Sequence, residues 1–376
     1  MGEGLGLRAG QDFFYIFRDS LSGLEYIRNG QSLREQGLYV ELGAYKCHVF
    51  LDWREVLDNE WHQYAHLADY LDGRGVPSID EAMQELFLQP IHVAFKELVY
   101  ADVFRRLMAA RVIGPDAILD ADLAGEVEQK ATRLLSEIRR ITQGAGDEAA
   151  IAREMRQDLE AILELPILDA RVPSPDCAEA IKHLQSNLDD DAAIWGSLFG
   201  WCFVRCLGKV IQEADFDQQS RSWIDEWLLG KLMAGALADF GLSEGDAGRA
   251  VAVIKLLTTH QLWFEMQGPP DKRAYQVLQA ALQDAEIQQL IQVNRWQGAL
   301  WFNKESFERL LWWMLCLAVV DAQRDTSATD QVQPIVKRYG IVAELIQAEE
   351  KSEYQVEKLI EICAMRTRVP IDKHSQ

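Results

Sequence analysis

The stretch that decides the fold class is Pro90–Val112, which reads PIHVAFKELVYADVFRRLMAARV. Its apolar residues recur at spacings of three and four, which is the period of one face of an α-helix. They are Ile91, Phe95, Leu98, Val99, Val103 and Leu107. Similar faces appear in 116–142, 147–163, 190–213, 220–240, 246–264, 304–322 and 331–365. The sequence therefore predicts a mainly α protein, a bundle of ten or more helices.

The first 56 residues follow a different pattern, with short segments rich in aromatic and β-branched residues between glycine turns. The segments are Asp12–Arg18, Leu24–Arg28, Leu38–Leu42 and Lys46–Asp52. We expect a small antiparallel sheet with little core of its own, similar to the end of a β-sandwich. The sequence thus predicts two domains. Residues 1–56 form the end of an all-β domain, and residues 57–376 form an α-helical bundle, with a candidate boundary between two halves of the bundle near 165–175. Helix caps are expected at Ser78, Ser243 and Ser306.

Charge and composition exclude several classes of function. The 376 residues carry 38 Lys and Arg against 59 Asp and Glu, a net charge of -21. Nucleic acids and anionic membrane surfaces both need a basic partner, so neither is expected to bind this chain. The most apolar run, Leu310–Val320, covers about half of a membrane span and is predicted to be a buried helix. Six scattered cysteines without a CxxC pair, and a glycine-rich start unlike a signal peptide, indicate a cytoplasmic setting.

One N-terminal stretch carries a family resemblance. Phe17–Arg28 (FRDSLSGLEYIR), followed by Tyr39–Leu51 (YVELGAYKCHVFL), resembles the last strands of the all-β C-terminal domain of α-amylase-family glycoside hydrolases. Arg295–Glu305 (RWQGALWFNKE) is similar to a helical extension of some long bacterial members. The resemblance implies that the chain is the C-terminal portion of an enzyme acting on α-glucans. Its expected partners are an upstream catalytic barrel and the glucan, and its helices would form an accessory or homo-oligomerisation module.

The family's catalytic residues have no counterpart in this sequence. The Gly-x-Arg-x-Asp motif and the late His-Asp pair of the family are both missing, and residues 57–376 lack the alternating strands of a (β/α)₈ barrel. No catalytic residue can therefore be carried over, and we expect the chain alone to be inactive. No cofactor and no metal are expected either.

Two tryptophans are the strongest candidates for contact with a sugar. Trp296 and Trp301 lie in sequence beside Arg295 and Asn303, whose polar groups could bind hydroxyls. Aromatic rings stack on the faces of pyranose sugars, so these four residues form the predicted substrate site. Packing within the bundle is the commoner role of such rings and remains the alternative.

Three further groups of residues invite a chemical interpretation, and each has a simpler one. His62, His66 and Asp69 could share a helix face as metal ligands, but Gln63 replaces the glutamate of an HExxH motif. Cys202 and Cys206 could bind metal or form a redox pair, but their apolar neighbours indicate burial. The run Asp189–Asp191 could hold Mg²⁺, but consecutive residues point in different directions on a helix, and a capping role is favoured.

A second class of function is a free-standing helical scaffold or protein-interaction module with a small β cap. The acidic helices, which are poor in motifs, favour this alternative. It predicts that residues 1–56 cover their own apolar surface, whereas the glycosidase hypothesis predicts an uncovered sheet face.

Overall fold

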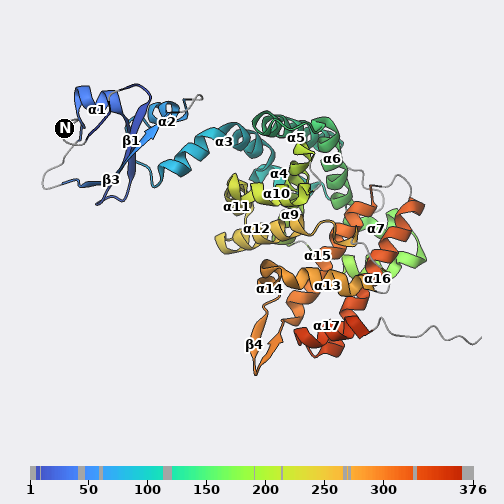
Figure 1. The fold of residues 1–376 in the computed structure, drawn as a ribbon. Coiled ribbons are helices and arrows are strands. Elements are labelled where there is room, and N and C mark those ends of the chain that lie inside the picture. The colour runs from blue at the N-terminus through green and yellow to red at the C-terminus, as the bar shows by residue number, and fades with distance from the viewer. Residues whose placement is uncertain are drawn as a thin grey trace, which may run out of the picture. The chain divides into compact units, whose positions relative to one another are not determined.

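A computed structural model describes residues 6–8, 10–40, 47–58, 62–112, 121–189, 191–212, 215–265, 269, 272–324 and 328–365. Within these ranges the chain is mainly α with a small antiparallel sheet near its N-terminus, which confirms the predicted fold class (Figure 1). The contacts divide the chain into two compact units, Met1–Pro90 and Ile91–Gln376. This boundary falls later than the one predicted after residue 56, because the helices that follow the sheet pack against it.

The sheet of the first unit has three described strands in the order β2-β1-β3, all antiparallel. They are β1 (Phe13–Asp19), β2 (Glu25–Asn29) and β3 (Phe50–Leu57). The strand predicted at Leu38–Leu42 is wrong where the structure describes it, because Leu38–Val40 are irregular. Its last two residues, 41 and 42, lie outside the described chain. β3 also extends to Leu57, five residues beyond the end of the predicted strand Lys46–Asp52.

The motif that carries the family resemblance forms the turn between β1 and β2. Asp19 accepts hydrogen bonds from the Ser22 hydroxyl (2.7 Å) and the Leu21 N–H (3.2 Å). Gly23 follows with a φ of 72°, a conformation that glycine adopts without steric cost. Across the turn, Arg18 Nη2 donates to Glu25 Oε1 at 2.8 Å. These motif residues therefore close a hairpin.

Helices cover both faces of this sheet. Helix α1 (Gly30–Gln36) begins where Asn29-Gly30 resembled a turn, because the Asn29 side chain caps it by accepting from the N–H groups of Gln31 and Ser32. It packs Leu33 against Tyr15 on one face. On the other face, α2 (Gln63–Leu71) and the start of α3 (Ile79–Leu98) pack against β1 and β2. The core on that face consists of Phe14, Ile16, Ile27, Leu67, Leu71 and Ile79.

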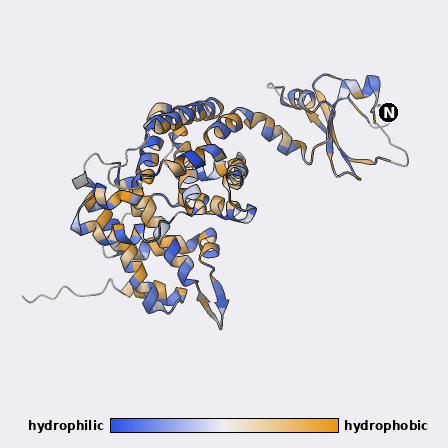
Figure 2. Cartoon of the chain, turned by 180° about the vertical axis from the view of Figure 1, so that it is seen from behind, coloured by the Kyte–Doolittle hydropathy of each residue, from blue (hydrophilic) through white to orange (hydrophobic). Residues whose placement is uncertain are grey.

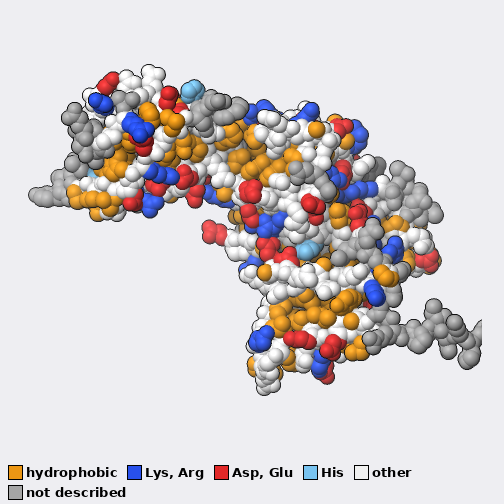
Figure 3. Space-filling model, in the orientation of Figure 1, with side chains coloured by type: hydrophobic (Ala, Val, Ile, Leu, Met, Phe, Trp, Pro, Cys, Tyr) orange, Lys and Arg blue, Asp and Glu red, His pale blue; other side chains and the backbone are white. Residues whose placement is uncertain are grey.

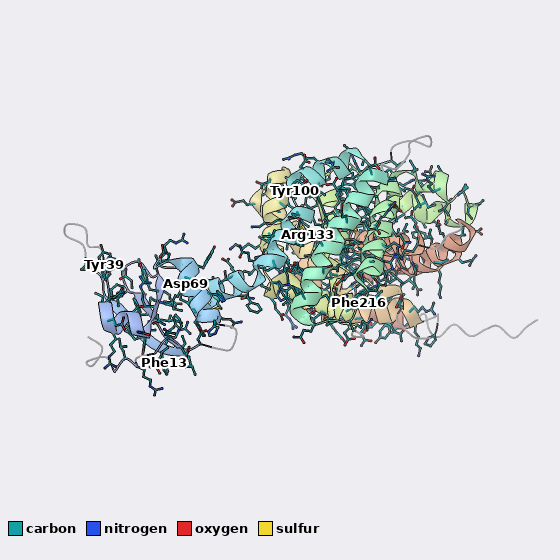
Figure 4. All side chains as sticks on the ribbon, turned by 90° about the horizontal axis from the view of Figure 1, so that it is seen from above. Phe13, Tyr39, Asp69, Tyr100, Arg133 and Phe216 are labelled. Carbon is teal, nitrogen blue, oxygen red and sulfur yellow. The ribbon has the colours of Figure 1, made fainter. Side chains whose placement is uncertain are left out.

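The first unit nevertheless exposes apolar side chains. Most of the exposed large hydrophobic residues in the described chain belong to it: Leu21, Tyr39, Val49, Leu51, Leu57, Tyr70 and Phe87. Figure 3 shows apolar side chains on its visible face, and Figure 4 labels Tyr39, which is 83% exposed. The unit thus has its own core but leaves an apolar fringe uncovered.

The second unit is a helical assembly that includes the short turns at 165–177, where the sequence suggested a division. After the second half of α3 its helices are α4 (Ala101–Ala109), α5 (Ala121–Thr142), α6 (Glu148–Glu164), η1 (Leu165–Ile167), α7 (Leu168–Arg171), η2 (Pro175–Cys177), α8 (Ala178–Gln185), α9 (Ala192–Val204), η3 (Leu207–Ile211), α10 (Phe216–Glu226), α11 (Leu229–Phe240), α12 (Glu244–Thr259), η4 (Trp263–Glu265), α13 (Arg273–Gln283), α14 (Ala285–Leu290), α15 (Lys304–Ala322), α16 (Ala328–Ser352) and α17 (Val356–Met365). Three predicted helices, 90–112, 220–240 and 331–365, are each two helices.

The core of this unit is built on α9 and α15, whose residues are buried almost throughout. Leu310–Val320 lies within α15, which confirms the predicted buried helix, and Trp312 donates its indole N–H to the Leu184 carbonyl at 2.9 Å. The segment Ala192–Ile211 is long and apolar enough to span a membrane, and 89% of its apolar window is buried inside the protein. Hydrophobic and hydrophilic residues alternate around most of the other helices (Figure 2).

The helix caps agree with the sequence at two of three positions. The Ser78 hydroxyl accepts from the Glu81 N–H (3.3 Å), and the Ser243 hydroxyl accepts from the Asp246 N–H (3.1 Å). The cap predicted at Ser306 is wrong, because Asn303 caps α15 and accepts from the Ser306 N–H at 2.9 Å.

Candidate functional site

Three of the four predicted substrate residues, Arg295, Trp296 and Trp301, lie on a β-hairpin between α14 and α15 (Figure 1). Its strands are β4 (Asn294–Trp296) and β5 (Ala299–Trp301), joined by the two residues Gln297 and Gly298. Both turn residues have positive φ, 48° and 86°, as a type I′ turn requires. The base of the hairpin is fixed by hydrogen bonds from Leu300 N–H to Glu357 and from Phe302 N–H to the Tyr354 carbonyl.

The hairpin brings two of the four predicted residues together. Trp296 pairs with Ala299 and Asn294 with Trp301, so both tryptophans project from one face of the ribbon. Their ring centroids are 5.9 Å apart at an interplanar angle of 68°, and Trp296 is 58% exposed. The Trp301 indole N–H donates to the Trp296 carbonyl at 3.2 Å, which fixes the second ring. The pair forms an exposed aromatic corner.

The other two predicted residues do not join this corner. Arg295 pairs with Leu300, and both lie on the opposite face of the ribbon from the tryptophans. The Asn303 side-chain oxygen is engaged in the α15 cap. The geometry thus narrows the predicted sugar contact to Trp296 and Trp301.

His62 and Asp191 lie at the starts of α2 and α9, respectively. His62 precedes α2 in a left-handed conformation, and its Nδ1 lies 3.6 Å from Asp58 Oδ2. His66 and Asp69 are exposed on α2, and no described metal-ligand group includes them (Asp69 is labelled in Figure 4). Asp191 caps α9 by accepting from the Ala193 N–H at 2.8 Å, as predicted. Asp190 lies outside the described residues.

The two cysteines four residues apart are buried free thiols. Burial raises the pKa of the Cys206 thiol to about 11 and that of Cys202 well above its usual range. A protonated thiol is neither a nucleophile nor a metal ligand, so both cysteines act as small apolar side chains. Cys202 Sγ lies 3.4 Å from the Met155 carbonyl, to which it can donate.

Beside these thiols lies a buried ion network that the periodicity of the sequence does not predict. Three cations and two carboxylates meet there, from α6, the η3 region and α15. Arg205 Nη2 donates to Glu154 (3.1 Å), and Arg205 Nη1 lies 3.0 Å from Asp158 Oδ2. We call Glu154, Asp158, Arg205, Lys209 and Arg324 the ion network. Its sequence signal was one arginine inside the apolar run Ala192–Val210.

The remaining members, Lys209 and Arg324, add two cations, and Arg324 also pairs with Asp321 at 3.2 Å. Lys209 Nζ donates to both Glu154 oxygens (2.7 and 2.6 Å), and Arg324 Nε donates to Asp158 Oδ1 (2.8 Å). Burial raises the pKa of Asp158 despite the opposing fields of Arg205 and Arg324. Burial opposes the charge on Arg205 as well, but Asp158 and Glu154 outweigh it and raise the pKa of the guanidinium.

Glu154, Asp158 and Cys206 place three ligand atoms within 4.8 Å of one another, close enough to hold a metal ion. Both carboxylates are already neutralised by three cations, and the thiol keeps its proton. A divalent cation would have to displace those cations in a buried position. The geometry therefore favours a structural ion network over a metal centre.

A second buried carboxyl lies in α16. Glu349 is fully buried, and neither of its oxygens has a hydrogen-bond partner. Burial and the nearby Glu308 raise its pKa to about 7. Perturbed pKa values often mark active sites. Its other charged neighbours are Lys304, Glu305 and Glu350, and it lines none of the described cavities, so we interpret it as a structural acid.

Glu349 makes stability depend on pH. Its pKa is higher in the folded than in the unfolded protein, so the folded state binds the extra proton and loses stability as pH rises from about 4.5 to about 7. We expect a loss on the order of 2–3 kcal/mol in the free energy of unfolding. Urea unfolding at pH 5 and pH 8 would measure this difference. The decrease in the free energy of unfolding between the two pH values should be smaller in Glu349→Gln than in the unmodified chain. Glu361→Gln, at an exposed position on α17, is the control, and equal pH profiles in both variants would refute the assignment.

No family model, curated protein or solved structure matches this chain. The evidence about function therefore comes from its own residues.

Proposed function

We propose that this chain is the non-catalytic C-terminal portion of an α-amylase-like glycosidase that acts on α-glucans, with the catalytic barrel supplied outside this chain. The N-terminal resemblance supports the family. The carboxylates of the ion network are engaged by Arg205, Lys209 and Arg324, which supports a structural, non-catalytic role for this cluster.

The observation that carries the proposal is the aromatic corner of Trp296 and Trp301. An exposed indole fixed on a rigid hairpin presents a flat apolar face to solvent at little conformational cost. Sugar rings have apolar faces of the same kind, so the corner suits one or two glucose units of an α-glucan.

We also infer a cytoplasmic setting, because all six cysteines are free thiols. The net charge of -21 supports partners other than nucleic acid or an anionic membrane. Self-association through the apolar fringe of the first unit is a further part of the proposal.

Trp296→Ala is expected to weaken binding to soluble amylose or maltoheptaose about tenfold or more, because it removes the exposed half of the corner. Affinity electrophoresis or calorimetry would measure the loss. Arg295→Ala is the matched control, since this residue lies on the opposite face of the same hairpin. An equal loss in both variants, or no binding by the unmodified chain, would contradict the proposed glucan contact.

The alternative function, a helical scaffold or interaction module, is favoured by one observation. Helices cover both faces of the N-terminal sheet, so this unit has a core without a second sheet. The DNA sequence immediately upstream of the Met1 codon separates the two functions. An in-frame barrel-coding region would support the glycosidase, and a stop codon followed by a ribosome-binding site would favour the scaffold.

A further inference from the structure

The second unit contains an apolar cavity that the proposed function does not use. It has a volume of about 210 Å³, and most of its lining comes from α12, η4, α13 and α15. Figure 1 shows α12, α13 and α15 next to one another. Leu257, Trp263, Val277, Leu310 and Leu317 line it, and each of them is at most 5% exposed. The Trp263 indole N–H donates to the Met314 carbonyl at 2.9 Å, so this polar group is already satisfied. The walls are therefore apolar.

Polar groups lie at one part of the lining. His260 Nε2 lies 2.7 Å from Asp284 Oδ2, and Asp284 is held in place because its other oxygen accepts from the Glu286 N–H at 2.7 Å. Asp217 and Thr259 also line the cavity, and the Thr259 hydroxyl donates to the Lys255 carbonyl at 3.1 Å. The polar lining thus consists of His260, which Asp284 holds from outside the lining, together with Asp217 and the Thr259 hydroxyl.

These groups favour one kind of head group on a ligand. His260 Nε2 is engaged with Asp284, and in the tautomer that donates Nε2–H to this carboxylate, Nδ1 is a hydrogen-bond acceptor. Asp217 and Thr259 offer acceptor oxygens as well. A ligand that donates a hydrogen bond is matched at this end, whereas a carboxylate would meet the negative charge of Asp217 and Asp284.

We propose that this cavity binds a compact apolar molecule, about the size of a substituted benzene, that carries one hydroxyl donor. Apolar cavities of about 150 Å³ bind benzene, so the volume accommodates a ring with a small substituent. The cavity is partly open to solvent, so a small molecule can enter it without unfolding the surrounding helices. The apolar walls would hold the ring, and the His260 end would select the hydroxyl.

The test uses the full chain and three probes of similar size: p-cresol, toluene and benzoate. We expect saturable binding of p-cresol by calorimetry with a rise in melting temperature. Toluene should bind at least fivefold more weakly, and benzoate should not bind. Absence of saturable binding by p-cresol up to its solubility limit, or benzoate binding as tightly as p-cresol, would overturn the proposal.

Two variants locate the binding. Ala281→Phe fills the cavity from α13 and should abolish p-cresol binding, and Ala281→Val should weaken it if the larger variant does not fold. His260→Leu keeps the cavity apolar and should bring p-cresol and toluene to equal affinity. Unchanged p-cresol binding in a folded Ala281 variant would overturn the proposed location. Retained preference for p-cresol in His260→Leu would overturn the role of His260.

Discussion

Replacing Arg205 by methionine is expected to lower the free energy of unfolding by about 3–5 kcal/mol, the cost of leaving a buried charge without its partner. Arg205 is 3% exposed and Asp158 is fully buried, so water cannot replace the lost guanidinium. The change also removes a hydrogen bond to Glu154. Urea unfolding followed by tryptophan fluorescence would measure the loss, because most tryptophans lie in the second unit.

A double-mutant cycle isolates the pair. Asp158→Leu combined with Arg205→Met removes both charges, so the double variant should be more stable than Arg205→Met alone, while Glu154 keeps Lys209 and Arg324. Arg140→Met is the surface control, because its ion pair with Glu137 is exposed and should contribute less than about 1 kcal/mol. A cost for Arg205→Met no larger than that of Arg140→Met would show that the ion network is not structural.

Local periodicity predicts the long amphipathic helices well and the connections poorly. The interval 147–163 coincides with α6 almost residue for residue, and 304–322 coincides with α15. In contrast, Asn29-Gly30 reads as a turn from its composition, but the Asn29 side chain starts a helix. Both roles use the same asparagine chemistry, a side chain that bonds to nearby N–H groups, so the sequence alone does not separate them.

The hairpin site could be predicted from local sequence, whereas the ion network and the cavity could not. Trp296, Gln297, Gly298 and Trp301 are adjacent in sequence, and a two-residue turn with glycine is a local signal for a hairpin. That signal could have shown that Arg295 and Trp296 face opposite sides. The ion network joins residues 51 and 166 positions apart, and the residues that line the cavity come mainly from six helical segments: α10, α12, η4, α13, α14 and α15. Such sites depend on tertiary packing, for which one sequence offers no periodic signal.

Gly208→Ala is expected to destabilise the second unit by about 3 kcal/mol, toward the upper end for added volume in a packed core. A Cβ atom at this position would lie 2.2 Å from the Phe216 carbonyl oxygen, a backbone atom that cannot rotate away (Phe216 is labelled in Figure 4). The Gly208 N–H also donates to the buried Ser220 hydroxyl at 2.8 Å, so η3 and α10 cannot separate without losing this bond. Thermal or urea unfolding would measure the effect.

The same close approach recurs on the other side of η3, which explains the size of the expected effect. A Cβ at Gly144 would lie 2.3 Å from the Val210 carbonyl oxygen, so η3 makes close glycine contacts at both Gly208 and Val210. Lys209, between these two residues in sequence, belongs to the ion network. Displacing η3 would therefore disturb the ion network too. Gly248→Ala is the control, because this exposed α12 position has no atom near a new Cβ and should gain about 0.5–1 kcal/mol. If both substitutions were stabilising, the tight packing of η3 would be refuted.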